Sequence, residues 1–188
     1  MTHYPSAIDR TCADGDAELY DECGSQMQLF RAGLEEANKT GKTLIVSYGA
    51  EWCIWCHVFD AHVNGVTGKY EYRAYEKRLS MVERSGDEVL LDARKLNEYA
   101  AKNLIIAHVE ADKAPDGLDV LRAAGVDPAT VRGYPYIFSV TGSGKLAAVF
   151  DQDTSETRRD DPRDLYRGYD RTSLLSQLMQ MRHAAASR

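Results

Sequence analysis

The pattern of apolar and polar positions predicts strands and helices that alternate along most of the chain. Ser25 can cap a first helix and Gly41 can end it, because the apolar residues between them recur at helical spacing. Two compact apolar runs, "KTLIVSYGA" from Lys42 and "NLIIAHVEAD" from Asn103, are typical of buried strands. The residues "EWCIWC" follow the first run and lead into "HVFDAHV", which can form a helix.

The second half of the chain repeats this alternation and then ends in a hairpin and a helix. A helix is predicted from about Pro115 or Asp116 to Gly125. "YPYIFSVTGSGKLAAVF" reads as strand, Gly-rich turn and strand. "RTSLLSQLMQM" closes the fold as a helix. The order predicts an α/β fold with a central mixed sheet flanked by helices, whose last hairpin adds an antiparallel edge.

Three segments stand outside this regular order. Residues 1–24 are expected to form an irregular N-terminal arm, and residues 25–188 a single domain. Residues 63–98 and 151–166 look like insertions, the second loop-like. A helical insertion is predicted for the first, with a short helix and then a longer one. The short helix would bury one face formed by Tyr72, Tyr75, Leu79 and Val82.

Composition and charge narrow the class of protein. The chain has 188 residues, of which 44% are hydrophobic and 28% charged, as in ordinary globular domains. A net charge of −6 gives no support to nucleic-acid binding. Apolar runs are too short to cross a bilayer, and the first residues lack a signal-peptide pattern. The protein is therefore expected either to stay in the cytoplasm or to be exported with its signal removed.

The four cysteines fall into two pairs. Cys12 and Cys23 lie in the polar, acidic stretch "TCADGDAELYDEC". Free cysteines favour burial, so this setting favours a structural disulfide and an oxidising compartment, although two unrelated thiols remain an alternative. Cys53 and Cys56 form a C-x-x-C motif within "EWCIWCH" that follows a buried strand and opens a helix. The helix N-terminus stabilises a thiolate on Cys53, and Cys56 lies one turn further in.

The same seven residues admit other chemistry. C-x-x-C-H is the attachment motif of c-type haem, but the β-rich surroundings are not those of a small cytochrome. Cys53, Cys56, His57 and His62 offer metal ligands, yet no second C-x-x-C or H-x-x-H pair completes a structural zinc site. We expect no metal and no cofactor. Copper delivery is retained as an alternative function.

At this point the chain resembles the thioredoxin family. "TLIVSYGAEWCIWC" is similar to the strand and active-site turn, "VRGYPYIF" to the cis-proline segment, and "TGSGKLAAVF" to the closing hairpin. The residues around the dithiol are similar to those of thioredoxin-like domains in bacterial thiol:disulfide interchange proteins. The resemblance implies a thioredoxin-like fold and a thiol–disulfide oxidoreductase, in which Cys53 attacks and Cys56 resolves. A binding module without disulfide turnover is the alternative.

The resemblance also implies partners and further site residues. Protein disulfides would be the substrates and a redox protein the partner, with reduction favoured as the direction. The location would be periplasmic or otherwise exported. The expected substrate-contacting residues are Trp52, Trp55, Tyr134 and Pro135, with Pro135 in the cis form.

Three positions depart from the family pattern. Ser47 stands where many thioredoxins carry a buried acid that exchanges a proton with the resolving thiol, and serine does not titrate in this range. Glu51 is a candidate replacement relay or simply a solvated charge. Ile54–Trp55 replaces the common Gly-Pro between the cysteines and places an aromatic side chain beside the sulfurs.

Overall fold

A computed structural model of the protein describes residues 2–12, 17–74, 77–84, 86–161 and 163–187. The strands are β1 (Thr2–Tyr4), β2 (Thr43–Gly49), β3 (Lys69–Ala74), β4 (Lys77–Val82), β5 (Leu104–Glu110), β6 (Tyr136–Val140), β7 (Leu146–Val149), β8 (Glu156–Arg159) and β9 (Tyr166–Tyr169). The helices are α1 (Gln26–Thr40), α2 (Ile54–Val63), α3 (Asp87–Asn103), α4 (Gly117–Ala124), the short 3₁₀ helix η1 (Pro128–Thr130) and α5 (Arg171–Ala186).

Five strands form one mixed sheet in the order β1-β5-β2-β6-β7. β1 and β2 both run parallel to β5, whereas β6 pairs antiparallel with β2 and β7 antiparallel with β6. Parallel strands need crossover connections. The α2–α3 segment connects the neighbours β2 and β5, and α1 connects β1 to β2, which lie on the two sides of β5. This strand order, with α2 directly after β2 and a hairpin at the edge, is the thioredoxin-like fold that the resemblance implied.

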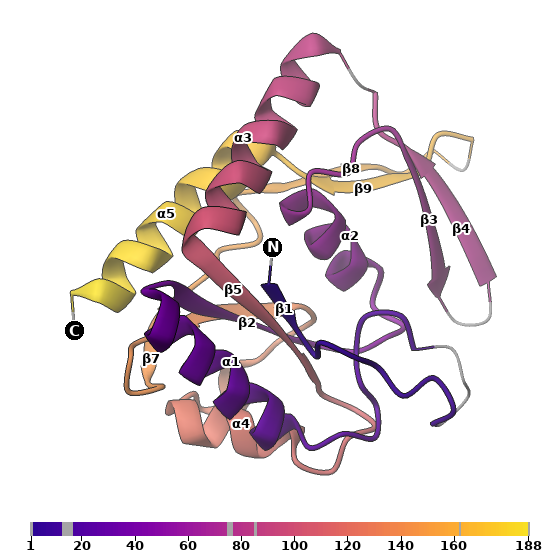
Figure 1. The fold of residues 1–188 in the computed structure, drawn as a ribbon. Coiled ribbons are helices and arrows are strands. Elements are labelled where there is room, and N and C mark those ends of the chain that lie inside the picture. Colours follow the sequence, from indigo (N-terminus) through magenta and orange to yellow (C-terminus); the bar gives the residue numbers. More distant parts are fainter. Residues whose placement is uncertain (1, 13–16, 75–76, 85, 162, 188) are drawn as a thin grey trace.

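The central strands are buried on both faces, which explains their continuous apolar runs. One face, with Ile45, Ile106 and Ile137, packs against α2, α3 and α5. The opposite face, with Val46 and Phe138, packs against α1 and α4. Figure 1 shows these two groups of helices on opposite sides of the sheet.

The predicted ends of α1 and α4 are confirmed. The Ser25 hydroxyl accepts a hydrogen bond from the Gln28 amide at 3.3 Å, which caps α1. Gly41 and Gly125 follow α1 and α4 with φ of 68° and 79°, a left-handed conformation that glycine adopts without steric cost. None of the helices in the described residues is long and apolar enough to cross a membrane.

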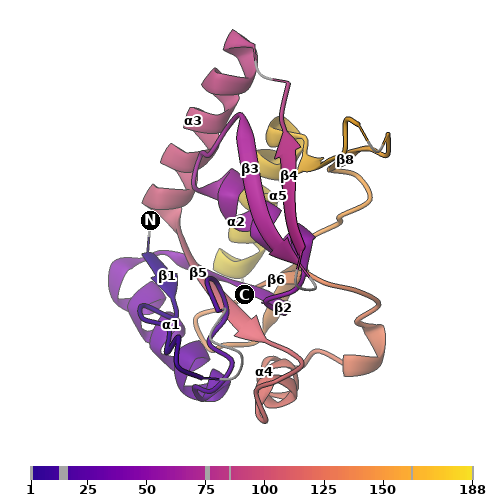
Figure 2. The same cartoon turned by 90° about the vertical axis from the view of Figure 1, so that its right-hand side faces the viewer.

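The first insertion is only half helical, so the predicted short helix is wrong. Residues 69–74 and 77–82 instead form an antiparallel strand pair, β3–β4, that lies over α2 in Figure 2. Buried and exposed side chains alternate with a period of two residues, as in a strand: Tyr70 and Tyr72 are buried, whereas Lys69 and Glu71 are exposed. The predicted helix face included Tyr75, which lies outside the described residues. The longer helix is confirmed as α3.

The other two irregular segments also contain strands. Thr2–Tyr4 at the start of the expected arm is β1, which joins the sheet beside β5. Such a short strand carries too few residues to show a period in the sequence. The expected loop after residue 150 contains the β8–β9 hairpin. This hairpin exposes much of its surface, and it therefore carries charged residues such as Arg158 and Arg159. A charged stretch of this kind is typical of a loop, which is why the strands were not predicted.

Candidate functional site

The dithiol motif occupies the start of α2, as the sequence predicted. Cys53 is the N-cap residue, and its sulfur accepts a hydrogen bond from the Cys56 amide at 3.2 Å. The two cysteines are joined in a disulfide with a Cα–Cα distance of 5.3 Å. Cys53 retains 4% of its surface exposed and Cys56 none. Cys53 is therefore the outer sulfur and the one at the positive end of the helix.

The outer sulfur is covered by residues from distant parts of the chain. Tyr20 is fully buried in one cluster with both cysteines, and Leu19, Trp55 and Tyr134 pack against that cluster. Sequence reasoning missed Tyr20, because it lies in a polar stretch without periodicity. Its place beside the dithiol is seen only from its packing against Cys53 and Cys56 in the structure.

Tyr20 reaches the place where the family's buried acid would stand. Its hydroxyl lies 3.2 Å from the Ser47 hydroxyl, so two neutral groups occupy this position. A Cβ added at Gly49 would meet both Cys56 Sγ and the Tyr20 hydroxyl, which shows that both lie over this glycine. Burial raises the pKa of Tyr20 far above its ordinary value, despite the opposing hydrogen bond to Ser47. Tyr20 therefore stays neutral.

Glu51 is not simply a solvated charge, because its carboxylate has several partners. Its carboxylate accepts hydrogen bonds from the amides of Leu19 and Tyr20 at 3.0 and 2.9 Å. It also pairs with His57 Nε2 at 3.2 Å. Burial by itself would raise the pKa of Glu51, but the hydrogen bond and charge of His57 and the two amides lower it. Glu51 thus fixes the segment that carries Tyr20.

The His57 side chain hydrogen-bonds to Glu51. Its Nε2 lies 2.6 Å from the Glu51 carbonyl oxygen and donates to it. Burial would lower the pKa of His57, yet the hydrogen bond and charge of the Glu51 carboxylate outweigh it and raise the pKa. The structure therefore assigns His57 to the support of the N-terminal segment.

Aromatic residues on the other side of the dithiol are linked by Asp112. Its two carboxylate oxygens accept from Trp52 Nε1 at 2.8 Å and from the Tyr134 hydroxyl at 2.9 Å. The Trp52 and Tyr134 rings lie 5.8 Å apart. The Tyr134–Pro135 peptide bond is cis, as the resemblance implied. Asp112 was missed by sequence analysis, where it reads as one of many charges after a strand.

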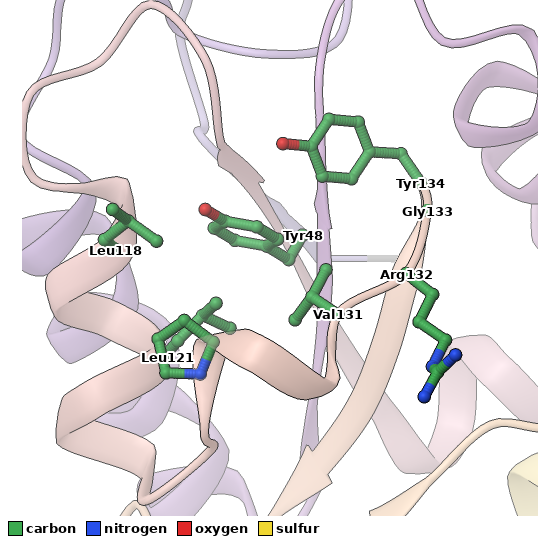
Figure 3. A pocket seen from close by; sticks show the side chains of 8 residues that line it. Tyr48, Leu118, Leu121, Val131, Arg132, Gly133 and Tyr134 are labelled. Carbon is green, nitrogen blue, oxygen red and sulfur yellow. The ribbon is translucent and has the colours of Figure 1, made fainter.

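A groove of about 310 Å³ opens beside Tyr134. In Figure 3, Leu118 and Leu121 from α4 face Tyr48 from β2, with Val131 and Tyr134 on the far side. The edge of the Tyr48 ring meets the Tyr134 ring at 5.8 Å. The groove thus connects an apolar surface with the segment next to the dithiol.

Trp55 and His62 are turned toward the interior. Trp55 is half-buried, with its ring 5.4 Å from that of Tyr169. His62 is fully buried: its Nδ1 donates to the Val58 carbonyl, and its Nε2 accepts from the Tyr169 amide. Burial, reinforced by the charge of Arg171, lowers the pKa of His62 to about 3. Both ring nitrogens are occupied, so His62 does not complete a metal site with the cysteines.

The second cysteine pair lies outside this site. Cys12 and Cys23 are joined in a disulfide with a Cα–Cα distance of 6.1 Å. Leu19 and Tyr20 lie between the two cysteines in the sequence, so the loop that this disulfide closes contains the residues that pack over the dithiol. Its position is that of a structural cross-link rather than of an exchanging pair.

The chain was also compared with known proteins and solved structures. No protein-family model and no curated protein matches the chain. The chain is similar to the crystal structure of a disulphide isomerase from Xylella fastidiosa Temecula1, at 16% identity and a TM-score of 0.44. The likeness covers 67% of this chain and 73% of that chain. The fold assignment rests on the strand order and connections described above.

Proposed function

We propose that the protein is a thiol–disulfide oxidoreductase that acts on protein disulfides through Cys53 and Cys56. The observation that carries the proposal is the placement of this pair at the N-terminus of α2, closed as a disulfide and next to the cis Tyr134–Pro135 bond. A helix N-terminus stabilises a thiolate, and a second thiol one turn away can displace a bound partner.

In the reducing direction the reaction proceeds by two exchanges. The Cys53 thiolate attacks one sulfur of a substrate disulfide, and the other substrate sulfur leaves as a thiolate. The Cys56 thiolate then attacks Cys53 Sγ, which releases the first substrate sulfur and closes the Cys53–Cys56 disulfide. Two electrons pass to the substrate, and a redox partner must return them. Because Cys53 is 4% exposed, the side chains above it must move for a substrate sulfur to reach it.

The groove and the aromatic residues supply a place for the substrate chain. Trp52 and Tyr134 are held by Asp112 on one side of the dithiol. The lining of the groove beside Tyr134 includes Leu118, Leu121 and Val131, together with polar groups. An extended peptide could lie there with its disulfide toward Cys53. These contacts support a protein substrate that meets Trp52, Tyr134 and Pro135. Trp55 is half-buried against Tyr169, so we expect only its exposed part to meet the substrate.

The test is a comparison of two single-cysteine variants. Cys56→Ser should accumulate mixed disulfides with glutathione or a model protein disulfide, because Cys53 attacks but nothing releases the adduct. Cys53→Ser should accumulate almost none. Intact-mass measurement under non-reducing conditions detects the mixed disulfides in both variants. A Cys12→Ser, Cys23→Ser double variant shows whether the other cysteine pair contributes to them. The opposite pattern would reverse the two roles.

A binding module is the second candidate, which the low exposure of Cys53 favours. If neither variant traps a partner and the wild type lacks reductase activity, that candidate replaces the enzyme. The direction of electron flow is read from the reduction potential. We propose reduction, for which a potential near the −270 mV of thioredoxin is expected, whereas about −120 mV would indicate an oxidase.

The Cys12–Cys23 disulfide supports a location outside the cytoplasm, because structural disulfides persist in oxidising compartments. We propose a periplasmic or otherwise exported protein on this ground. Expression in the source cell with a fractionation readout tests it.

A further inference from the structure

Three potential metal ligands converge behind the dithiol helix. His3 comes from β1, Asp60 from α2 and His108 from β5. His3 Nδ1 lies 3.3 Å from His108 Nε2 and 3.3 Å from Asp60 Oδ1, and His108 Nε2 lies 3.2 Å from Asp60 Oδ1. Three atoms that can each donate an electron pair thus form a nearly equilateral triangle.

Asn64 fixes which nitrogen of His3 faces this triangle. The Asn64 side-chain amide donates to the Asp60 carbonyl at 3.0 Å and to Asp60 Oδ1 at 3.1 Å. Because both of these partners only accept, that end of the amide must be the NH₂ group. The other end is therefore the oxygen, and it accepts from His3 Nε2 at 3.1 Å. In the neutral ring His3 Nδ1 then carries a lone pair, directed at the same place as the Asp60 carboxylate.

The triangle has the dimensions of one face of a tetrahedral zinc site. Zinc–nitrogen bonds of about 2.0–2.1 Å place neighbouring tetrahedral ligands about 3.3–3.4 Å apart. Two imidazoles and a carboxylate are ligands that zinc accepts, and the contact of Asn64 with His3 and Asp60 matches the outer hydrogen bonds that orient such ligands. We propose that His3, Asp60 and His108 bind one Zn²⁺ ion, with a fourth position left for water or another ligand.

The burial of the three residues suits an ion that enters from solvent. His108 is 1% exposed, which fixes one ligand rigidly on the central sheet. The side chains of His3 and Asp60 are 22% and 26% exposed, so the ion can reach the site. The site is separate from the cysteines and independent of the proposed function. It also revises the expectation of no metal, which considered only Cys53, Cys56, His57 and His62.

The ion would join three elements that are far apart in the sequence. β1 is three residues long and lies at the edge of the sheet, beside β5. Coordination through His3 would tie this strand to α2, the helix that opens with the dithiol. We therefore expect the bound ion to hold β1 in place and to raise the melting temperature of the whole chain.

The binding test uses the full chain with both disulfides closed, so that sulfur cannot ligate the ion. After treatment with a chelator, Zn²⁺ is titrated in a calorimeter, and one ion per chain is expected. Co²⁺ then serves as a spectroscopic probe: tetrahedral d–d bands without sulfur charge-transfer bands are expected. Absence of binding of one ion per chain would overturn the site.

Substitutions assign the ligands. His3→Ala and Asp60→Asn should each weaken Zn²⁺ binding by more than about 100-fold, and Asn64→Ala by the 10–100-fold typical of outer-shell partners. His183→Ala, at an exposed histidine of α5, is the matched control and should bind as the wild type does. Circular dichroism establishes that each variant folds, and His3→Ala decides if Asp60→Asn does not fold. Unchanged affinity in a folded His3→Ala or Asp60→Asn variant, or an equal loss in His183→Ala, would contradict the proposal.

Discussion

Two regions added to the five-stranded frame are held in place by different means. The hairpin region, formed by β3, β4, β8 and β9, covers α2 from one side and is joined to the domain by a buried ionic network. The N-terminal segment, residues 17–24, lies over the dithiol and is held by hydrogen bonds, an ion pair and a disulfide. The hairpin region is thus held by buried side chains, whereas the N-terminal segment is held mainly by contacts at its surface.

The ionic network of the hairpin region centres on Glu83. Arg171 Nη2 lies 2.9 Å from Glu83 Oε2, and both side chains are nearly buried. The hydroxyls of Tyr70 and Tyr166 donate to the same carboxylate at 2.6 and 3.2 Å. Burial would raise the pKa of Glu83, but the hydrogen bond from Arg171 and then that from Tyr70 lower it. The carboxylate therefore stays charged and joins β3, β9 and the start of α5.

The N-terminal segment has no comparable interior. Ala17 and Tyr20 are its buried apolar residues, and Leu19 is partly buried beside them. Polar contacts make up much of the remaining attachment. Glu51 accepts two of its amides, Lys113 pairs with Glu22 at 2.8 Å, and the Cys12–Cys23 bond closes the loop. A segment that buries so little apolar surface offsets its ordering entropy only with such cross-links. The difference predicts that the hairpin region is more sensitive to single substitutions.

The largest effect is expected from Arg171→Ala. Removal of one partner of a buried ion pair leaves Glu83 charged without compensation, so the free energy of unfolding should fall by about 3–5 kcal/mol. Urea denaturation measures this. The double variant Arg171→Met, Glu83→Gln should be less destabilised, because no buried charge remains.

Arg122→Ala provides the control for that prediction. Arg122 pairs with Asp119 at 2.9 Å on the surface of α4, and both side chains are more than half exposed. Such pairs contribute about 0–1 kcal/mol. An equal loss of unfolding free energy in Arg171→Ala and Arg122→Ala would contradict the view that a buried ionic network stabilises the hairpin region.

The same contrast explains what sequence analysis achieved. The strands β2, β5, β6 and β7 and the helices that cover them could be predicted, because their apolar runs and the caps at Ser25 and Gly41 are local signals, whereas β1 was too short to be recognised. The place of Cys53 at a helix N-terminus followed from the same reasoning. The β3–β4 hairpin could not, since its tyrosines fit either period and its burial depends on Arg171, about a hundred residues away. Tyr20 and Asp112 act through contacts that no periodicity records.

An intermediate effect is expected from the disulfide of the N-terminal segment. The double variant Cys12→Ser, Cys23→Ser frees a short loop in the unfolded chain, and the chain-entropy account gives a loss of about 2–3 kcal/mol. Chemical denaturation of oxidised protein measures it, with non-reducing mass analysis to establish the native pairing. If the wild type shows two alkylatable thiols at these positions, the covalent tie of this region is refuted.

The smallest effect is expected at Glu51 and His57, and it depends on pH. The pKa of His57 is raised from its ordinary 6.5, so its contribution to stability is full below pH 6.5 and is lost as pH rises through the raised value. The pKa of Glu51 is lowered from 4.5, so its contribution is full above pH 4.5 and is lost as pH falls through the lowered value. The pair therefore stabilises most between these two ordinary values.

His57→Gln tests this window, because glutamine can still donate to Glu51 but carries no titrating charge. The wild type should exceed the variant in unfolding free energy by about 1 kcal/mol near the middle of the window, and the difference should shrink at higher pH. His183→Gln, at an exposed site, should show no such profile. A difference that stays constant up to high pH would mean that His57 supports the N-terminal segment by packing alone, and the two added regions would then differ less than the ionic contacts suggest.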